Sequence, residues 1–288
     1  MKKIRSNSFP RKRSILPAAC AALLSSLALL ASPAHAADAS AWAREGQAAM
    51  RLIAGSAKPG ATTLRAGIEL ELAPGWHTYW RYPGDSGIPP RFDFSGSHNL
   101  ASAKVAYPTP HLYTDETGNT LGYKNRVIFP VQVTPEQPGK PVDLHVKVDY
   151  AVCDKLCMPA KGQATLTLSP GTSANETMLT AAEAAVPKPV APATLGLTTK
   201  RVTAAGKPAV DVDLTAPKGE PVHIFAEGPT AEWALPVPQQ VAGAPPGKLR
   251  FRFQLDGLPP GVSPKAPAEL TFTVVEGKQA FQTQSRLD

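Results

Sequence analysis

Strict alternation of apolar and polar residues is the feature that most constrains this fold. It runs from Val142 to Val152, where every second side chain is apolar, and it returns in Leu64–Leu72, Val127–Val133 and Leu249–Leu255. Successive side chains of a strand point to opposite faces of a sheet, so this pattern predicts strands with one buried face. Antiparallel sheets that are solvated on one side have this pattern. We therefore expect an all-β protein built from antiparallel β-sandwiches.

The alternation stops between residues 175 and 192. Asn175 is a favourable N-cap, and Leu179, Ala182 and Val186 have helical spacing. A proline-rich stretch, residues 187–192, follows at once and has the composition of a stiff linker. The sequence therefore predicts one short helix followed by a linker.

The length of 288 residues is typical of two domains. We expect a first sandwich at residues 37–174, the helix and linker at 175–192, and a second sandwich at 193–288. The strand spacing predicts an immunoglobulin-like fold for both. The second sandwich has no cysteine, and we expect it to be a spacer or docking module.

The N-terminal residues have the pattern of a bacterial signal peptide. Residues 1–36 contain six basic residues, all before residue 14, and no acidic residue. The apolar stretch Ile15–Leu30 follows the basic residues, and a small-x-small site lies at Ala34–Ala36. We expect cleavage after Ala36, export to the periplasm and no membrane insertion of the mature chain. The rest of the chain is almost neutral, so no basic surface is expected to bind nucleic acid.

Two cysteines, Cys153 and Cys157, remain after loss of the signal peptide. In an oxidising compartment they are expected to pair, and the intervening residues must turn, because an extended chain would hold the Cα atoms about 13 Å apart. The alternation places Cys153 on the exposed face, where a partner could reach it. A bridge across so short a loop stabilises little, which favours a redox-active pair over the alternative, a structural disulfide in a non-catalytic sandwich.

A second alternative is a copper-binding or copper-tolerance module. Cys153, Cys157 and Met158 are soft ligands that suit Cu(I). A Cys-x-x-x-Cys pair alone is not a specific metal signature. The sequence contains no P-loop, dinucleotide fingerprint or Gly-x-Ser-x-Gly motif, so we expect thiol–disulfide exchange without a cofactor.

Three stretches, in order, resemble the N-terminal periplasmic domain of the thiol-disulfide interchange protein DsbD and its relative ScsB. They are Pro74–Arg81, Gly122–Val131 and Val148–Pro159. The resemblance covers roughly residues 45–170 and implies an immunoglobulin-like domain with a redox-active cysteine pair. It also implies a protein-disulfide reductase type of activity. The implied partners are a membrane-embedded DsbD/CcdA-like electron donor, expected on another chain, and periplasmic thioredoxin-like or disulfide isomerase proteins.

The same resemblance implies roles for individual residues. Cys153 and Cys157 match the exchanging pair, with Cys157 meeting the partner, and Tyr150 and Tyr79 match active-site neighbours.

A cap loop over the cysteines matches residues 111–123 by position, and Asp115 and Glu116 match its acidic pair. Thr117 stands where the family has an aromatic residue. The side chains then expected to shield the sulfurs are Leu112, Tyr113 or Leu121.

Overall fold

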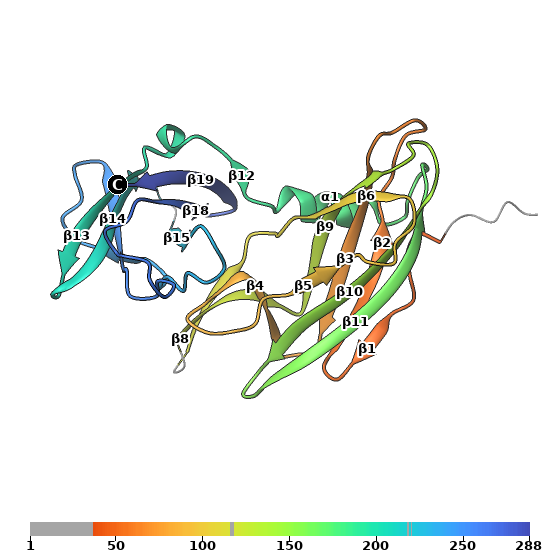
Figure 1. The fold of residues 1–288 in the computed structure, drawn as a ribbon, viewed down its shortest axis with the longest axis horizontal. Coiled ribbons are helices and arrows are strands. Elements are labelled where there is room, and N and C mark those ends of the chain that lie inside the picture. Colours follow the sequence, from red (N-terminus) through yellow and green to blue (C-terminus); the bar gives the residue numbers. More distant parts are fainter. Residues whose placement is uncertain (1–36, 116–117, 218, 220) are drawn as a thin grey trace, which may run out of the picture. The chain divides into compact units, whose positions relative to one another are not determined.

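The computed structural model describes residues 37–115, 118–217, 219 and 221–288, and its regular secondary structure is almost entirely β-strand (Figure 1). The predicted signal peptide and Glu116 of the predicted acidic pair lie outside the described residues, and of Asp115 only the backbone is described. Within this part of the chain, no helix has the length and apolar character needed to cross a membrane.

The first sandwich consists of two antiparallel sheets. The five-stranded sheet has the order β1-β2-β3-β9-β6, with strands Ala43–Glu45 (β1), Ala48–Ala54 (β2), Leu64–Leu72 (β3), Leu100–Val105 (β6) and Arg126–Pro135 (β9). The six-stranded sheet has the order β11-β10-β4-β8-β7, and β5 pairs with β10. Its strands are His77–Gly84 (β4), Arg91–Asp93 (β5), His111–Asp115 (β7), Gly118–Lys124 (β8), Val142–Cys153 (β10) and Cys157–Leu168 (β11).

The core of the first sandwich lies where the alternation predicts it. The apolar positions of Leu64–Leu72 and Val142–Val152 are buried, and they pack with the aromatic side chains of Trp80 and Phe129, which are both fully buried. Each of these strands keeps one face toward this core, which is the arrangement that a period of two requires.

The predicted helix is α1, Glu176–Ala184, and it follows β11. Leu179 packs against Ile53 and Ile128 on the outer side of the five-stranded sheet. Asn175 occupies the N-cap position, but its side chain does not cap the helix and instead donates to the backbone oxygen of Asp38 at 2.8 Å. The helix therefore begins where predicted and is held by apolar packing rather than by its cap.

The second sandwich also consists of two antiparallel sheets, apart from one parallel strand pair. One sheet has the order β13-β14-β17-β16, with strands Thr198–Ala204, Lys207–Thr215, Lys248–Gln254 and Gln239–Val241. The other has the order β12-β19-β18-β15, with strands Lys188–Pro189, Gln279–Leu287, Ala268–Glu276 and Val222–Glu227. The proline-rich stretch thus supplies β12, which pairs in parallel with β19, and a short 3-10 helix, Pro192–Leu195. The prediction of an all-β, immunoglobulin-like fold is confirmed.

Candidate functional site: a disulfide at the end of a hairpin

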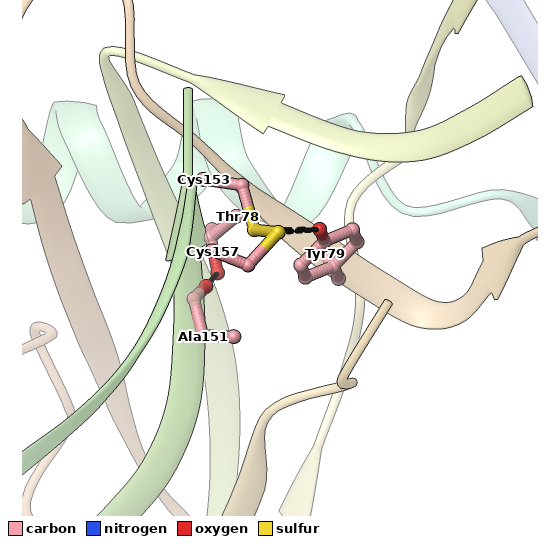
Figure 2. The surroundings of a disulfide bond; sticks show 5 residues. All are labelled: Thr78, Tyr79, Ala151, Cys153 and Cys157. Atoms are coloured by element: carbon pink, nitrogen blue, oxygen red, sulfur yellow. Dashed lines mark hydrogen bonds between the residues drawn. A yellow bond between two sulfur atoms is a disulfide. The ribbon is translucent and has the colours of Figure 1, made fainter. Parts of the chain in front are cut away.

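The two cysteines lie opposite each other at the end of the β10–β11 hairpin. The strands pair without interruption from Val142↔Leu168 to Cys153↔Cys157, and residues 154–156 form the turn. The Cα atoms are 4.1 Å apart, and the sulfurs form a disulfide (Figure 2). The predicted turn is therefore present, and the long register of the hairpin brings the cysteines together.

The two sulfurs differ in accessibility. Cys157 is exposed, whereas Cys153 is only 1% exposed. The prediction that Cys153 points outward to a partner was wrong. It does lie on the face predicted by the alternation, but Tyr79 and Ala151 cover it there. Alternation assigns a residue to a face of its sheet and carries no information about which side chain of another strand covers that face.

The hydroxyl of Tyr79, on β4, lies close to both sulfurs of the disulfide. Its hydroxyl oxygen lies 2.7 Å from Cys153 Sγ and 3.3 Å from Cys157 Sγ (Figure 2). Disulfide sulfurs carry no hydrogen, so the tyrosine hydroxyl must be the donor. The Tyr79 ring lies against Gly87, where an added Cβ would come within 2.3 Å of the ring. The structure thus brings Tyr79 to the sulfurs, as the family resemblance implies.

A second contact from β4 was not anticipated from the sequence. The buried Thr78 hydroxyl donates to the backbone oxygen of Ala151 at 2.8 Å (Figure 2). Strands β4 and β10 pair directly at only one position, Cys153↔His77. The Thr78 side chain therefore continues the link between these strands beyond that pair. The sequence feature that indicates this contact is a hydroxyl residue within a strand rich in aromatic residues.

Tyr150 and Met158 lie on the opposite face of the hairpin. Tyr150 is 3% exposed within the core, and burial raises its pKa to about 12. Met158 packs against the same core. The structure brings neither side chain to the sulfurs, so the three proposed Cu(I) ligands do not share a face. No group of three or more His, Cys, Asp or Glu side chains suited to a metal ion occurs among the described residues.

The segment matched to the cap loop is a β-hairpin at one edge of the six-stranded sheet. Its second strand, β8, pairs with β4, so that Gly122 lies opposite Tyr79. A Cβ at Gly122 would come within 2.0 Å of the Thr78 carbonyl oxygen. Glycine at this position allows the hairpin to approach the strand that carries Thr78 and Tyr79.

The three expected shielding side chains do not act alike. Leu121 is fully buried in the core, and Leu112 packs against that core. Tyr113 instead approaches His77, with 6.3 Å between ring centroids, and Lys124, whose Nζ lies 4.1 Å from the Tyr113 ring centroid. Among these three, only Tyr113 lies beside a residue that pairs with Cys153.

Asp85 fixes the cap hairpin from the neighbouring turn. Its carboxylate accepts hydrogen bonds from the Asn119 backbone at 2.8 Å and from the Asn119 side chain at 3.1 Å. The backbone nitrogen of Asp85 also donates to the Asn119 carbonyl oxygen. Asp85 thus ties the Pro-Gly-Asp-Ser-Gly segment, residues 83–87, to β8.

Comparison with known proteins agrees with the sequence resemblance. Residues 47–169 match the family model described as "Thiol:disulfide interchange protein DsbD, N-terminal". The crystal structure of the N-terminal periplasmic domain of ScsB from Proteus mirabilis matches with a TM-score of 0.68 and 19% identity, over 87% of this chain and 98% of that chain. A conserved domain protein from Bacillus anthracis aligns with a TM-score of 0.26 and 13% identity, over 84% of this chain and 78% of that chain. No curated protein matches the chain. The resemblance to the DsbD N-terminal family is confirmed over residues 47–169, and the likeness to ScsB confirms the fold.

Proposed function

We propose that this protein is a periplasmic thiol–disulfide exchange protein of the protein-disulfide reductase type. The observation that carries the proposal is the unequal exposure of the two sulfurs in one disulfide, Cys157 exposed and Cys153 buried beside a hydroxyl donor. The family match over residues 47–169 supports the same chemistry. A periplasmic location is supported by the description of the ScsB domain as periplasmic.

In the reducing direction, the thiolate of Cys157 attacks one sulfur of a partner disulfide. A mixed disulfide forms as the partner's second sulfur leaves as a thiolate and takes up a proton. Cys153 then loses its proton and attacks Cys157 Sγ, which re-forms the Cys153–Cys157 disulfide and releases the partner as a dithiol. Two electrons and two protons pass to the partner in each cycle.

The surroundings support this division of roles. An attacking thiolate must be accessible, and Cys157 is the exposed member. Asp154 follows Cys153 directly, and its negative charge disfavours a thiolate there. The Tyr79 hydroxyl lies within hydrogen-bond distance of Cys153, so it stabilises the thiolate of Cys153 at the moment of resolution.

The pair must be reduced again after each cycle. We propose a membrane-embedded DsbD/CcdA-like thiol transporter on another chain as the donor, and periplasmic thioredoxin-like or disulfide isomerase proteins as acceptors. Residues 37–174 carry the chemistry in this scheme. The second sandwich, residues 193–288, contains no cysteine and takes no covalent part.

The experiment uses reduced protein and the disulfide reagent 5,5′-dithiobis(2-nitrobenzoate), with release of thionitrobenzoate followed by absorbance. Wild type is expected to release two equivalents, because Cys153 resolves the adduct on Cys157. Cys153→Ser is expected to react rapidly, release one equivalent and remain a mixed disulfide. Cys157→Ser is expected to react at least tenfold more slowly, because its remaining thiol is buried.

The reverse pattern would reassign the attacking sulfur. A reduction potential for the pair below about −300 mV would identify a structural disulfide and refute the exchange function. Measurement against a dithiothreitol redox buffer settles this second point independently of the order of attack.

A further inference from the structure

Two exposed apolar side chains lie on separate segments near the disulfide. Among the described residues, Ile88 and Leu156 are the large apolar side chains that lie mostly in solvent, 55% and 70% exposed. Leu156 is the last residue of the hairpin turn and directly precedes Cys157. Ile88 follows Gly87, whose backbone lies against the ring of Tyr79. Single exposed apolar residues are common on protein surfaces, but here both lie on segments that adjoin the disulfide or Tyr79, which contacts it.

Local structure does not account for either side chain. Short turns favour Gly, Asn, Asp, Ser and Pro, and Asp154 and Lys155 in this turn are polar, whereas Leu156 is apolar and exposed. Ile88 lies in an exposed run between β4 and β5 that also includes Asp85, Ser86 and Gly87. Both side chains are exposed, and neither packs in a hydrophobic core.

The geometry of exchange requires a partner to cover this region. In a mixed disulfide the partner's sulfur lies about 2 Å from Cys157 Sγ. A small redox interface buries about 600 Å² on each partner, a disc of roughly 14 Å radius. Cys157 Sγ contacts the Tyr79 hydroxyl, and the Tyr79 ring contacts Gly87, the residue before Ile88. This chain of contacts places the Ile88 Cα within roughly 13 Å of Cys157 Sγ. Leu156 is the immediate neighbour of Cys157.

We infer that Ile88 and Leu156 form an apolar docking surface for a globular thiol protein whose reactive cysteine is bordered by apolar side chains, as in a thioredoxin-type partner. This inference rests on the proposed exchange function. The charged side chains in the turn, Asp154 and Lys155, have opposite signs, so the turn presents no field of one sign to steer a charged partner. Apolar contact at these two residues therefore selects a protein partner over a small thiol.

The test compares two reductants of the oxidised full-length protein: reduced thioredoxin, as the protein probe, and dithiothreitol, as the small probe. Leu156→Ser and Ile88→Ser are each expected to slow reduction by thioredoxin roughly tenfold, the loss typical of an interface anchor. Reduction by dithiothreitol is expected to stay within twofold of wild type. Lys155→Ser is the matched control in the same turn, and Leu156→Met, which keeps an apolar side chain, should retain most of the thioredoxin rate.

Unchanged thioredoxin rates in both serine variants would overturn the inference, and so would equal losses with both reductants, because these report altered loop geometry. Reduction of wild type by dithiothreitol but not by thioredoxin would also overturn it and leave the exchange function standing. Self-association that is lost in Leu156→Ser, with unchanged thioredoxin rates, would assign the surface to a second copy of the chain. Failure of both reductants would refute the exchange function itself.

Discussion

Reduction of the Cys153–Cys157 bond should leave the protein folded. An exchange protein must remain folded when its disulfide is reduced, whereas a protein with a structural disulfide need not. The cysteines are four residues apart, so the chain-entropy relation gives a stabilisation of only about 2 kcal/mol. The hairpin is already held by its continuous register from Val142↔Leu168 onward and by the buried residues of β10. For a chain of this size, about 2 kcal/mol corresponds to a fall in Tm of roughly 4–8 °C.

Thermal unfolding followed by circular dichroism, with and without a phosphine reductant, measures this shift. The two sandwiches can unfold separately, so the shift is read on the transition that responds to reductant. The double variant Cys153→Ser/Cys157→Ser should unfold at the temperature of the reduced wild type and be insensitive to reductant. A fall of more than about 15 °C, or loss of cooperative unfolding on reduction, would show that the bond holds the fold together and would refute this reasoning.

Two further predictions concern groups outside the disulfide. Thr78→Val removes the hydroxyl that donates to the buried Ala151 carbonyl oxygen. It should lower the free energy of unfolding, measured with denaturant, by about 1–3 kcal/mol, whereas Thr78→Ser should keep most of the wild-type stability. The pKa of Glu176 is lowered to about 2, first by the hydrogen bond from Arg65 and then by the Ser56 backbone N–H. Because the pKa of the folded state lies below the unfolded value, this contribution is present above about pH 4.5 and is lost as the pH falls toward 2. The stability difference between wild type and Glu176→Gln should therefore vanish over that range; a difference independent of pH would contradict it.

The sequence predicts well those parts of the site that depend on local pattern. The alternation from Val142 to Val152 identifies β10 and its buried face, and the return alternation in Ala164, Leu166 and Leu168 marks the partner strand. Once both strands are assigned, the spacing of the cysteines requires a turn between them. Such features involve neighbouring residues, and their physical cause lies within the segment itself.

Contacts between distant strands are harder to predict. Covering of Cys153 depends on β4 lying beside β10, a contact between residues more than 70 positions apart. A strand pattern in one segment does not say which other strand will be its neighbour. Tyr79 is therefore predicted from the family resemblance and not from the strand pattern. The resemblance also pointed to Tyr150, which the alternation assigns to the core face, and that is where the structure places it.

The order of strands explains why two cysteines on one face of one hairpin differ so strongly in exposure. Strand β10 has β11 on one side and β4 on the other, whereas β11 ends its sheet within the described residues. Cys153 is therefore covered by a side chain from β4, while Cys157 on the edge strand is exposed. This asymmetry arises from the backbone arrangement and does not depend on the disulfide, so it should persist in the reduced protein. Strand order thus distinguishes an exposed sulfur, which we propose attacks, from a covered sulfur, which we propose resolves, before any difference in charge around the two thiols contributes.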